Sequence, residues 1–176
     1  DGPPAERRRA LDRVVVARTL HRSMLLGLVL AGLEPVWVRP EVDPAHGLPL
    51  GVTAAALEAA LASAPDAKGV FIGEPSYVGT VGDVSALAAV AHRHGIPLVI
   101  DAAWGARLGF HPGLPPHALQ AGADALVTSA HKALPAWSQG AIVLARTTRI
   151  GRAQFDAAVE ATATTSPSGA RWKSVV

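Results

Sequence analysis

The chain has 176 residues and a mass of 18.1 kDa, the size of one domain. Its formal net charge of +2 is too small to indicate a nucleic-acid partner, and we interpret the run 7–9 of three arginines as a solvated turn. It has no cysteine and no apolar stretch of about 18 residues, so disulfides, thiolate metal sites and a membrane span are not expected, and its first residues do not predict a signal peptide. Because 49% of its residues are hydrophobic, a sizeable core is expected, and the absence of cysteine fits a cytoplasmic protein.

Short apolar runs alternate with helical patterns along the chain. The expected strands span residues 14–17, 35–38, 69–72, 98–100, 125–128 and 141–144. The expected helices span residues 23–31, 53–62, 83–94, 116–121 and 149–160. Thr53 and Asp83 are expected to cap helix N-termini, and Gly32 and Gly95 are expected to end helices.

The expected strands are continuous apolar runs, which is typical of strands buried on both faces. We therefore predict an α/β fold of three layers, with a mostly parallel sheet and helices on both faces. Strand 141–144 follows Lys132 too closely for a helical crossover, so it is expected to run antiparallel. The domain boundaries that follow are an irregular segment 1–13, a large domain 14–161 and a C-terminal loop or tail 162–176.

Two chemically distinctive residues follow predicted strands. Asp101 ends the run Pro97–Asp101, and Lys132, one of only three lysines, lies just beyond strand 125–128. In parallel sheets ligands bind beyond the carboxyl ends of the strands, so we expect these two residues to lie close together. A lysine amine bonds an aldehyde, and a carboxylate keeps a pyridine nitrogen protonated. These are the two groups that pyridoxal 5′-phosphate (PLP) requires of a protein.

Several longer motifs surround this pair and occur in the same order as in a known enzyme family. The chain resembles the large, PLP-binding domain of the ornithine/lysine/arginine decarboxylases, within the aspartate-aminotransferase fold type (fold type I), over nearly its whole length. The matching stretches are 18–23, 74–80, 101–106, 110–112, 122–124 and 129–132, the last followed by 134–136 and 139–140.

The resemblance implies a role for each residue expected around the cofactor ring. Lys132 is implied to bond the cofactor aldehyde, and Asp101 to pair with the pyridinium nitrogen. His21 is implied to stack on one face of the ring, with Ala103 packed against the other. Lys132, Asp101 and His21 are thus the expected catalytic residues.

The resemblance also implies how the cofactor phosphate is held. Ser129 and His131 are expected to reach the phosphate through a hydroxyl and an imidazole. Tyr77 is a further candidate for the lining of the site. Trp104 either walls the site or packs beneath it, and the sequence leaves both open. Thr165 lies in a stretch that resembles a region near the subunit interface of relatives, where it would serve the partner's phosphate.

The activity implied is decarboxylation of lysine, ornithine or arginine to an amine and CO₂, which would place the protein in amino-acid and polyamine metabolism. The resemblance also implies at least a homodimer. A second hypothesis keeps PLP but makes the protein an aminotransferase or aldolase. A third makes it a truncated, non-catalytic domain, because residues 1–9 do not resemble the family's phosphate-binding loop and no smaller C-terminal domain is recognised. Under each hypothesis the chain is expected to be a fragment.

His92 and His94 have a spacing that suits metal ligands. No acidic or cysteine partner is expected beside them, so no metal is predicted.

Overall fold

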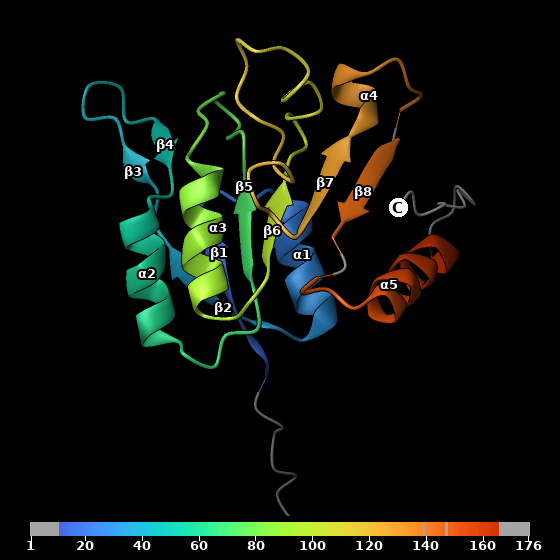
Figure 1. The fold of residues 1–176 in the computed structure, drawn as a ribbon, viewed down its shortest axis with the longest axis horizontal. Coiled ribbons are helices and arrows are strands. Elements are labelled where there is room, and N and C mark those ends of the chain that lie inside the picture. Colours follow the sequence, from blue (N-terminus) through green and yellow to red (C-terminus); the bar gives the residue numbers. More distant parts are fainter. Residues whose placement is uncertain (1–10, 139, 147, 166–176) are drawn as a thin grey trace, which may run out of the picture.

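The computed structural model describes residues 11–165 except 139 and 147, and does not describe the side chains of 161–165. A six-stranded sheet in the order β2-β1-β5-β6-β7-β8 forms its centre (Figure 1). Its strands are β1 (Arg13–Ala17), β2 (Glu34–Val38), β5 (Val70–Gly73), β6 (Leu98–Asp101), β7 (Ala125–Ser129) and β8 (Ala141–Ala145). A separate hairpin consists of β3 (Glu41–Val42) and β4 (Pro49–Gly51). The helices are α1 (Arg22–Ala31), α2 (Ala54–Ser63), α3 (Val84–Arg93), α4 (Ala130–Ala133) and α5 (Arg152–Thr165).

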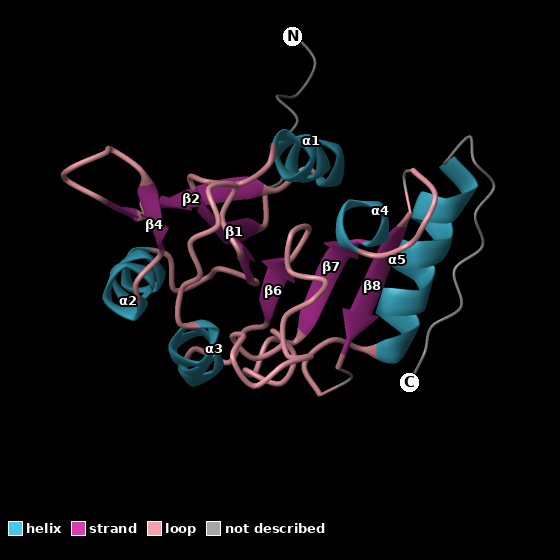
Figure 2. Ribbon diagram, turned by 90° about the horizontal axis from the view of Figure 1, so that it is seen from above, coloured by secondary structure: helices cyan, strands magenta, loops and turns pink. Residues whose placement is uncertain are grey.

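The sheet has helices on both faces, as predicted. Helices α2 and α3 cover one face and α1 covers the other (Figure 2). Strand β1 shows both layers, because Val15 and Ala17 belong to the large core cluster with α2 and α3, whereas Val14 and Val16 pack with Leu28 of α1. This alternation follows from the two-residue period of a strand. The α/β fold with a mostly parallel sheet is confirmed.

The direction of the last strand is also confirmed. Strand β8 pairs antiparallel with β7, and the other strand pairs of the large sheet are parallel. Helix ends follow the expected chemistry too. The Thr53 hydroxyl accepts the Ala56 N–H at 3.2 Å, the Asp83 carboxylate accepts the Ala86 N–H at 2.9 Å, and Gly32 ends α1 with a φ of 63°.

The predicted helix 116–121 is wrong. Residues 118–122 form turns, with one helical hydrogen bond from the Ala121 N–H to the His117 carbonyl at 3.0 Å. Two consecutive prolines, Pro115 and Pro116, supply no N–H group, and Gly122 adopts a φ of 106°, so the segment has room for about one turn. The short elements β3, β4 and α4 were not predicted.

The predicted loop from Thr162 is wrong at its beginning, because α5 continues to Thr165. The rest of that loop and tail, residues 166–176, lies outside the described residues, as do residues 1–10 of the expected N-terminal segment. Regular structure begins at Arg13, the first residue of β1. None of the helices that the structure describes is both long and apolar enough to cross a membrane.

Candidate functional site

The candidate site lies at the edge of the sheet where β5, β6 and β7 end, at the top of Figure 1. Strands β6 and β7 pair in parallel, and the register places Asp101 opposite Val127, two residues before Ser129. Helix α4 starts directly after β7 and carries Lys132. Asp101 and Lys132 therefore belong to the same edge of the sheet, and a close approach of the two side chains stays a prediction.

Lys132 contacts an aromatic side chain at this edge. Its ammonium lies over the ring of Trp104, with Nζ 4.8 Å from the ring centroid. The Tyr77 ring meets Trp104 edge to face, at a centroid distance of 6.4 Å and an interplanar angle of 74°. Trp104 is 48% exposed and Tyr77 is 87% exposed, so both rings line open surface beside the lysine. Trp104 therefore lies at the surface beside Lys132, and its role in the site stays a prediction.

The backbone around Asp101 fixes the direction of its carboxylate. Its Oδ1 accepts the Ala103 N–H at 3.0 Å, which closes a local turn directly after β6. The Ala102 N–H donates to the Val127 carbonyl at 2.7 Å, and the buried Thr128 hydroxyl donates to the Ala102 carbonyl at 2.7 Å. The loop that carries Asp101 and half-buried Ala103 is thus fastened to β7.

Helix α4 is held from two sides. The Gly140 carbonyl accepts the Ala130 N–H and lies 2.9 Å from His131 Nδ1. The Arg107 Nε–H donates to the Ala133 carbonyl at 3.1 Å. The Ser129 hydroxyl makes no capping bond to the helix. Sequence reasoning assigned no role to Arg107, because its acceptor is a backbone carbonyl 26 positions away and no pattern identifies it.

The structure does not bring every predicted site residue into contact with Lys132. His21 is exposed and caps the start of α1, where its Nδ1 lies 2.8 Å from the Ser23 hydroxyl and accepts the Ser23 N–H at 3.3 Å. It follows β1, which is separated from β6 by β5. Its stacking role therefore stays a prediction. Thr165 ends α5 and its side chain lies outside the described residues, so its role also stays a prediction.

The groups present at this edge fit PLP chemically. Lys132 is exposed and supplies an amine, and the oriented Asp101 supplies a carboxylate. Ser129, at the start of α4, supplies a hydroxyl, and His131, the residue before Lys132, supplies an imidazole. An amine for an aldehyde, a carboxylate for a pyridinium and polar hydrogens for a phosphate are the donor set that this cofactor requires.

A cavity of about 140 Å³ lies beside this edge, lined by Glu74, Ser85, His117 and Thr128 among others. Glu74 is 3% exposed and its Oε2 accepts the Gly82 N–H at 2.8 Å, whereas its Oε1 has no hydrogen-bond partner among the described residues. Burial raises the pKa of Glu74 and lowers the pKa of His117. The sequence analysis includes Glu74 only within the family stretch 74–80 and predicts no role for it. The signal that could have identified it is a carboxylate directly after the apolar strand β5.

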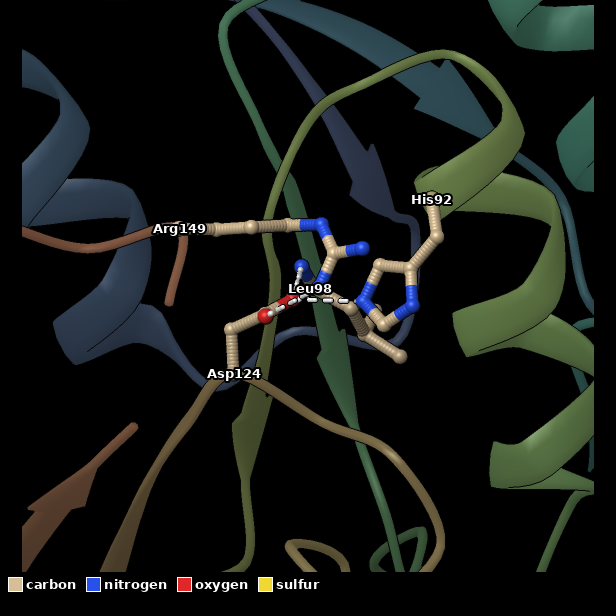
Figure 3. Close-up of polar contacts among 4 residues, drawn as sticks. All are labelled: His92, Leu98, Asp124 and Arg149. Carbon is tan, nitrogen blue, oxygen red and sulfur yellow. Dashed lines mark hydrogen bonds and ion pairs between the residues drawn. The ribbon is translucent and has the colours of Figure 1, made fainter. Parts of the chain in front are cut away.

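The expectation that His92 and His94 have no acidic partners is wrong. His92 Nε2 lies 2.8 Å from Asp124, which is buried and also contacts the Leu98 N–H and Arg149 (Figure 3). His94 Nε2 lies 2.7 Å from Glu58. These acidic residues are 32 and 36 positions away in sequence, so spacing did not reveal them. The two histidines face different carboxylates, and the described residues include no group of three metal-ligating side chains.

The chain belongs to the Orn/Lys/Arg decarboxylase family, because the model of its major domain matches residues 8–174. An arginine decarboxylase of Halalkalibacterium halodurans is 34% identical over 157 residues, which cover 89% of this chain and 32% of the relative. The chain therefore spans about a third of the length of the curated relatives it matches.

Solved structures agree on the fold. Mouse CSAD in its apo form has a TM-score of 0.61 and 26% identity, covering 78% of this chain and 30% of that one. A complex of SepCysS with the SepCysE N-terminal domain has a TM-score of 0.65 over 77% of this chain and 36% of that one. At 18% identity it supports the fold alone.

Proposed function

We propose that this chain is the PLP-binding core of a decarboxylase that acts on a basic amino acid: lysine, ornithine or arginine. The observation that carries the proposal is the shared edge of β6 and β7, where Asp101 and Lys132 lie at adjacent strand ends. The family match and the arginine decarboxylase relatives support the reaction class.

In this proposal PLP, when bound, withdraws the electrons that the departing carboxylate leaves behind. The residues of the chain position and polarise it. Lys132 would hold the cofactor through its aldehyde. Asp101 would keep the ring nitrogen protonated, with its carboxylate oriented by the Ala103 N–H. Ser129 and His131 contribute hydrogen bonds to the phosphate. A proton replaces the lost carboxylate, so the products are an amine and CO₂.

The first test is Lys132→Ala in the complete protein. The wild type is expected to develop a visible absorbance band with PLP and to retain a covalent adduct after borohydride treatment, and the variant is expected to lose both. Lys68→Ala, which removes an exposed lysine near the start of β5, is the matched control and should keep both signals. An adduct that survives in Lys132→Ala would reject the lysine assignment.

Product analysis separates the remaining hypotheses. Release of CO₂ and an amine from lysine, ornithine or arginine supports the decarboxylase, whereas a keto acid would indicate an aminotransferase. Absence of any PLP band in the complete wild-type protein would favour a non-catalytic domain.

A further inference from the structure

We propose that Trp104 is the positioning residue for Lys132 and holds the lysine ammonium over its indole face at the edge of the sheet. The inference rests on the proposed function, because it concerns the lysine expected to bond the cofactor. A cation within about 6 Å of an aromatic centroid is attracted by the negative ring face, and indole attracts it best. The observed distance from Nζ to the centroid is 4.8 Å.

Lys132 needs such a contact because little else restrains it. It lies on α4, a helix of four residues, and its side chain is exposed. A lysine side chain has many rotamers, and an exposed one samples most of them unless a neighbour selects among them. Within the described part of the chain, no carboxylate forms an ion pair with Lys132. The indole is therefore the group that the structure shows interacting with its charge.

The indole is itself fixed relative to α4. Arg107, three residues after Trp104, donates to the Ala133 carbonyl at 3.1 Å and so ties the Trp104 loop to the helix of Lys132. Tyr77 meets the indole edge to face from the loop after β5. Trp104 is half-exposed, which argues against a mere packing role beneath the site. The loop and the helix thus form one unit in which the ring and the amine face each other.

The experiment compares the reactivity of two lysines in the complete protein freed of cofactor. A neutral acylating reagent labels amines that are free to react, and peptide mass spectrometry gives the rate at Lys132 relative to that at exposed Lys68. Trp104→Leu removes the ring face, so the relative rate at Lys132 should rise about two- to five-fold, the factor that a cation–π contact at an exposed site represents. Trp104→Phe keeps a weaker face and should give a smaller rise.

Trp37→Leu is the matched control. Trp37 is a second partly exposed indole, and the Arg18 guanidinium lies 5.5 Å from its ring centroid. It is on β2, the edge strand that is separated from β5 by β1. This variant should leave the relative rate at Lys132 unchanged. An unchanged rate in both Trp104 variants would overturn the proposal, as would an equal rise in Trp37→Leu or a parallel rise at Lys68.

If circular dichroism shows that Trp104→Leu does not fold, Trp104→Phe alone decides: a rise at Lys132 supports the proposal and no rise overturns it. Failure of the proposed function is seen separately. A borohydride-stable adduct that persists in Lys132→Ala would reject the cofactor role, whatever the labelling rates show about Trp104.

Discussion

Asp101 illustrates how a single carboxylate is aimed before any ligand is present. Its Oδ1 accepts a hydrogen bond from the Ala103 N–H, and the adjoining Ala102 is bonded to β7 through both its N–H and its carbonyl. The side chain therefore takes its direction from the backbone and not from a neighbouring charge. Such preorganisation is what an electrostatic role in catalysis requires.

Replacing Asp101 with Asn isolates the charge from the geometry. An amide oxygen can still accept the Ala103 N–H, so the loop should keep its shape and the protein should still bind PLP. A neutral amide cannot stabilise a protonated ring nitrogen, and we expect turnover to fall about 100-fold or more. Steady-state CO₂ release and the PLP absorbance band measure the two effects. Near-normal turnover in the variant would refute the pyridinium role.

Glu74 makes stability depend on pH. Burial raises its pKa above the ordinary 4.5, so the native state binds this proton more tightly than the unfolded chain does. Stability from this group is fully present below pH 4.5 and is lost as the pH rises through the raised pKa. Glu74→Gln keeps an acceptor for the Gly82 N–H but cannot ionise. We expect the stability of the variant relative to the wild type to rise between about pH 5 and about pH 7.5.

Urea unfolding at the two pH values measures this difference. His117 acts in the opposite direction, because burial lowers its pKa and its contribution is lost as the pH falls below 6.5 through the lowered pKa. His117 is present in both proteins, so its effect cancels in the comparison. Parallel pH profiles for wild type and variant would show that Glu74 does not titrate in this range.

At the residue scale, the sequence located groups that stand at strand ends but not the contacts that loops create. Asp101 and Lys132 were predictable, because each follows an apolar run and parallel strands end at one edge. The Lys132–Trp104 contact depends on the path of the loop between β6 and β7, which no periodicity encodes. The Arg107 bond to a backbone carbonyl leaves no signature in sequence for the same reason.

At the element scale, buried strands and capped helices were predicted well, because continuous apolar runs and caps such as Thr53 are local signals. The elements that were missed are the short ones. Strand β3 has two residues and α4 has four, which is about one period of the strand and helix patterns and too short for a repeat to be seen. The predicted helix 116–121 shows the converse error, in which suitable composition lacked the length and the N–H groups needed for a helix.

Asp124 joins several elements at the edge opposite the candidate site. Its carboxylate is 1% exposed and contacts His92 of α3, the Leu98 N–H of β6 and Arg149 before α5 (Figure 3). Asp124→Ala removes the shared acceptor, and we expect it to lower the free energy of unfolding by about 3–5 kcal/mol. Asp66→Ala breaks a pair whose carboxylate is 61% exposed and should cost less than about 1 kcal/mol. Equal losses in urea unfolding would contradict a structural role for Asp124.

At the scale of the whole molecule, exposed apolar side chains indicate surface that is covered in the complete protein or its assembly. Leu26, Val29 and Leu30 of α1 are 54%, 75% and 89% exposed, and Ile142 and Val143 of β8 are partly exposed as well. Patches of this kind are uncommon on monomers. We expect the complete holoprotein to sediment as at least a homodimer, with each site shared between subunits. A fully active monomer in analytical ultracentrifugation would contradict this expectation.

The order of the strands also determines how much chain entropy each pairing costs. Strands β6 and β7 meet across a short separation, 26 positions between Ala102 and Thr128, whereas Val15 of β1 bonds to Gly69 across about twice that distance. In an unfolded chain each doubling of loop length adds about 0.6 kcal/mol to the cost of closure. The pairing of β6 with β7, which lies next to Asp101 and α4, therefore costs less chain entropy than the pairing of β1 with β5.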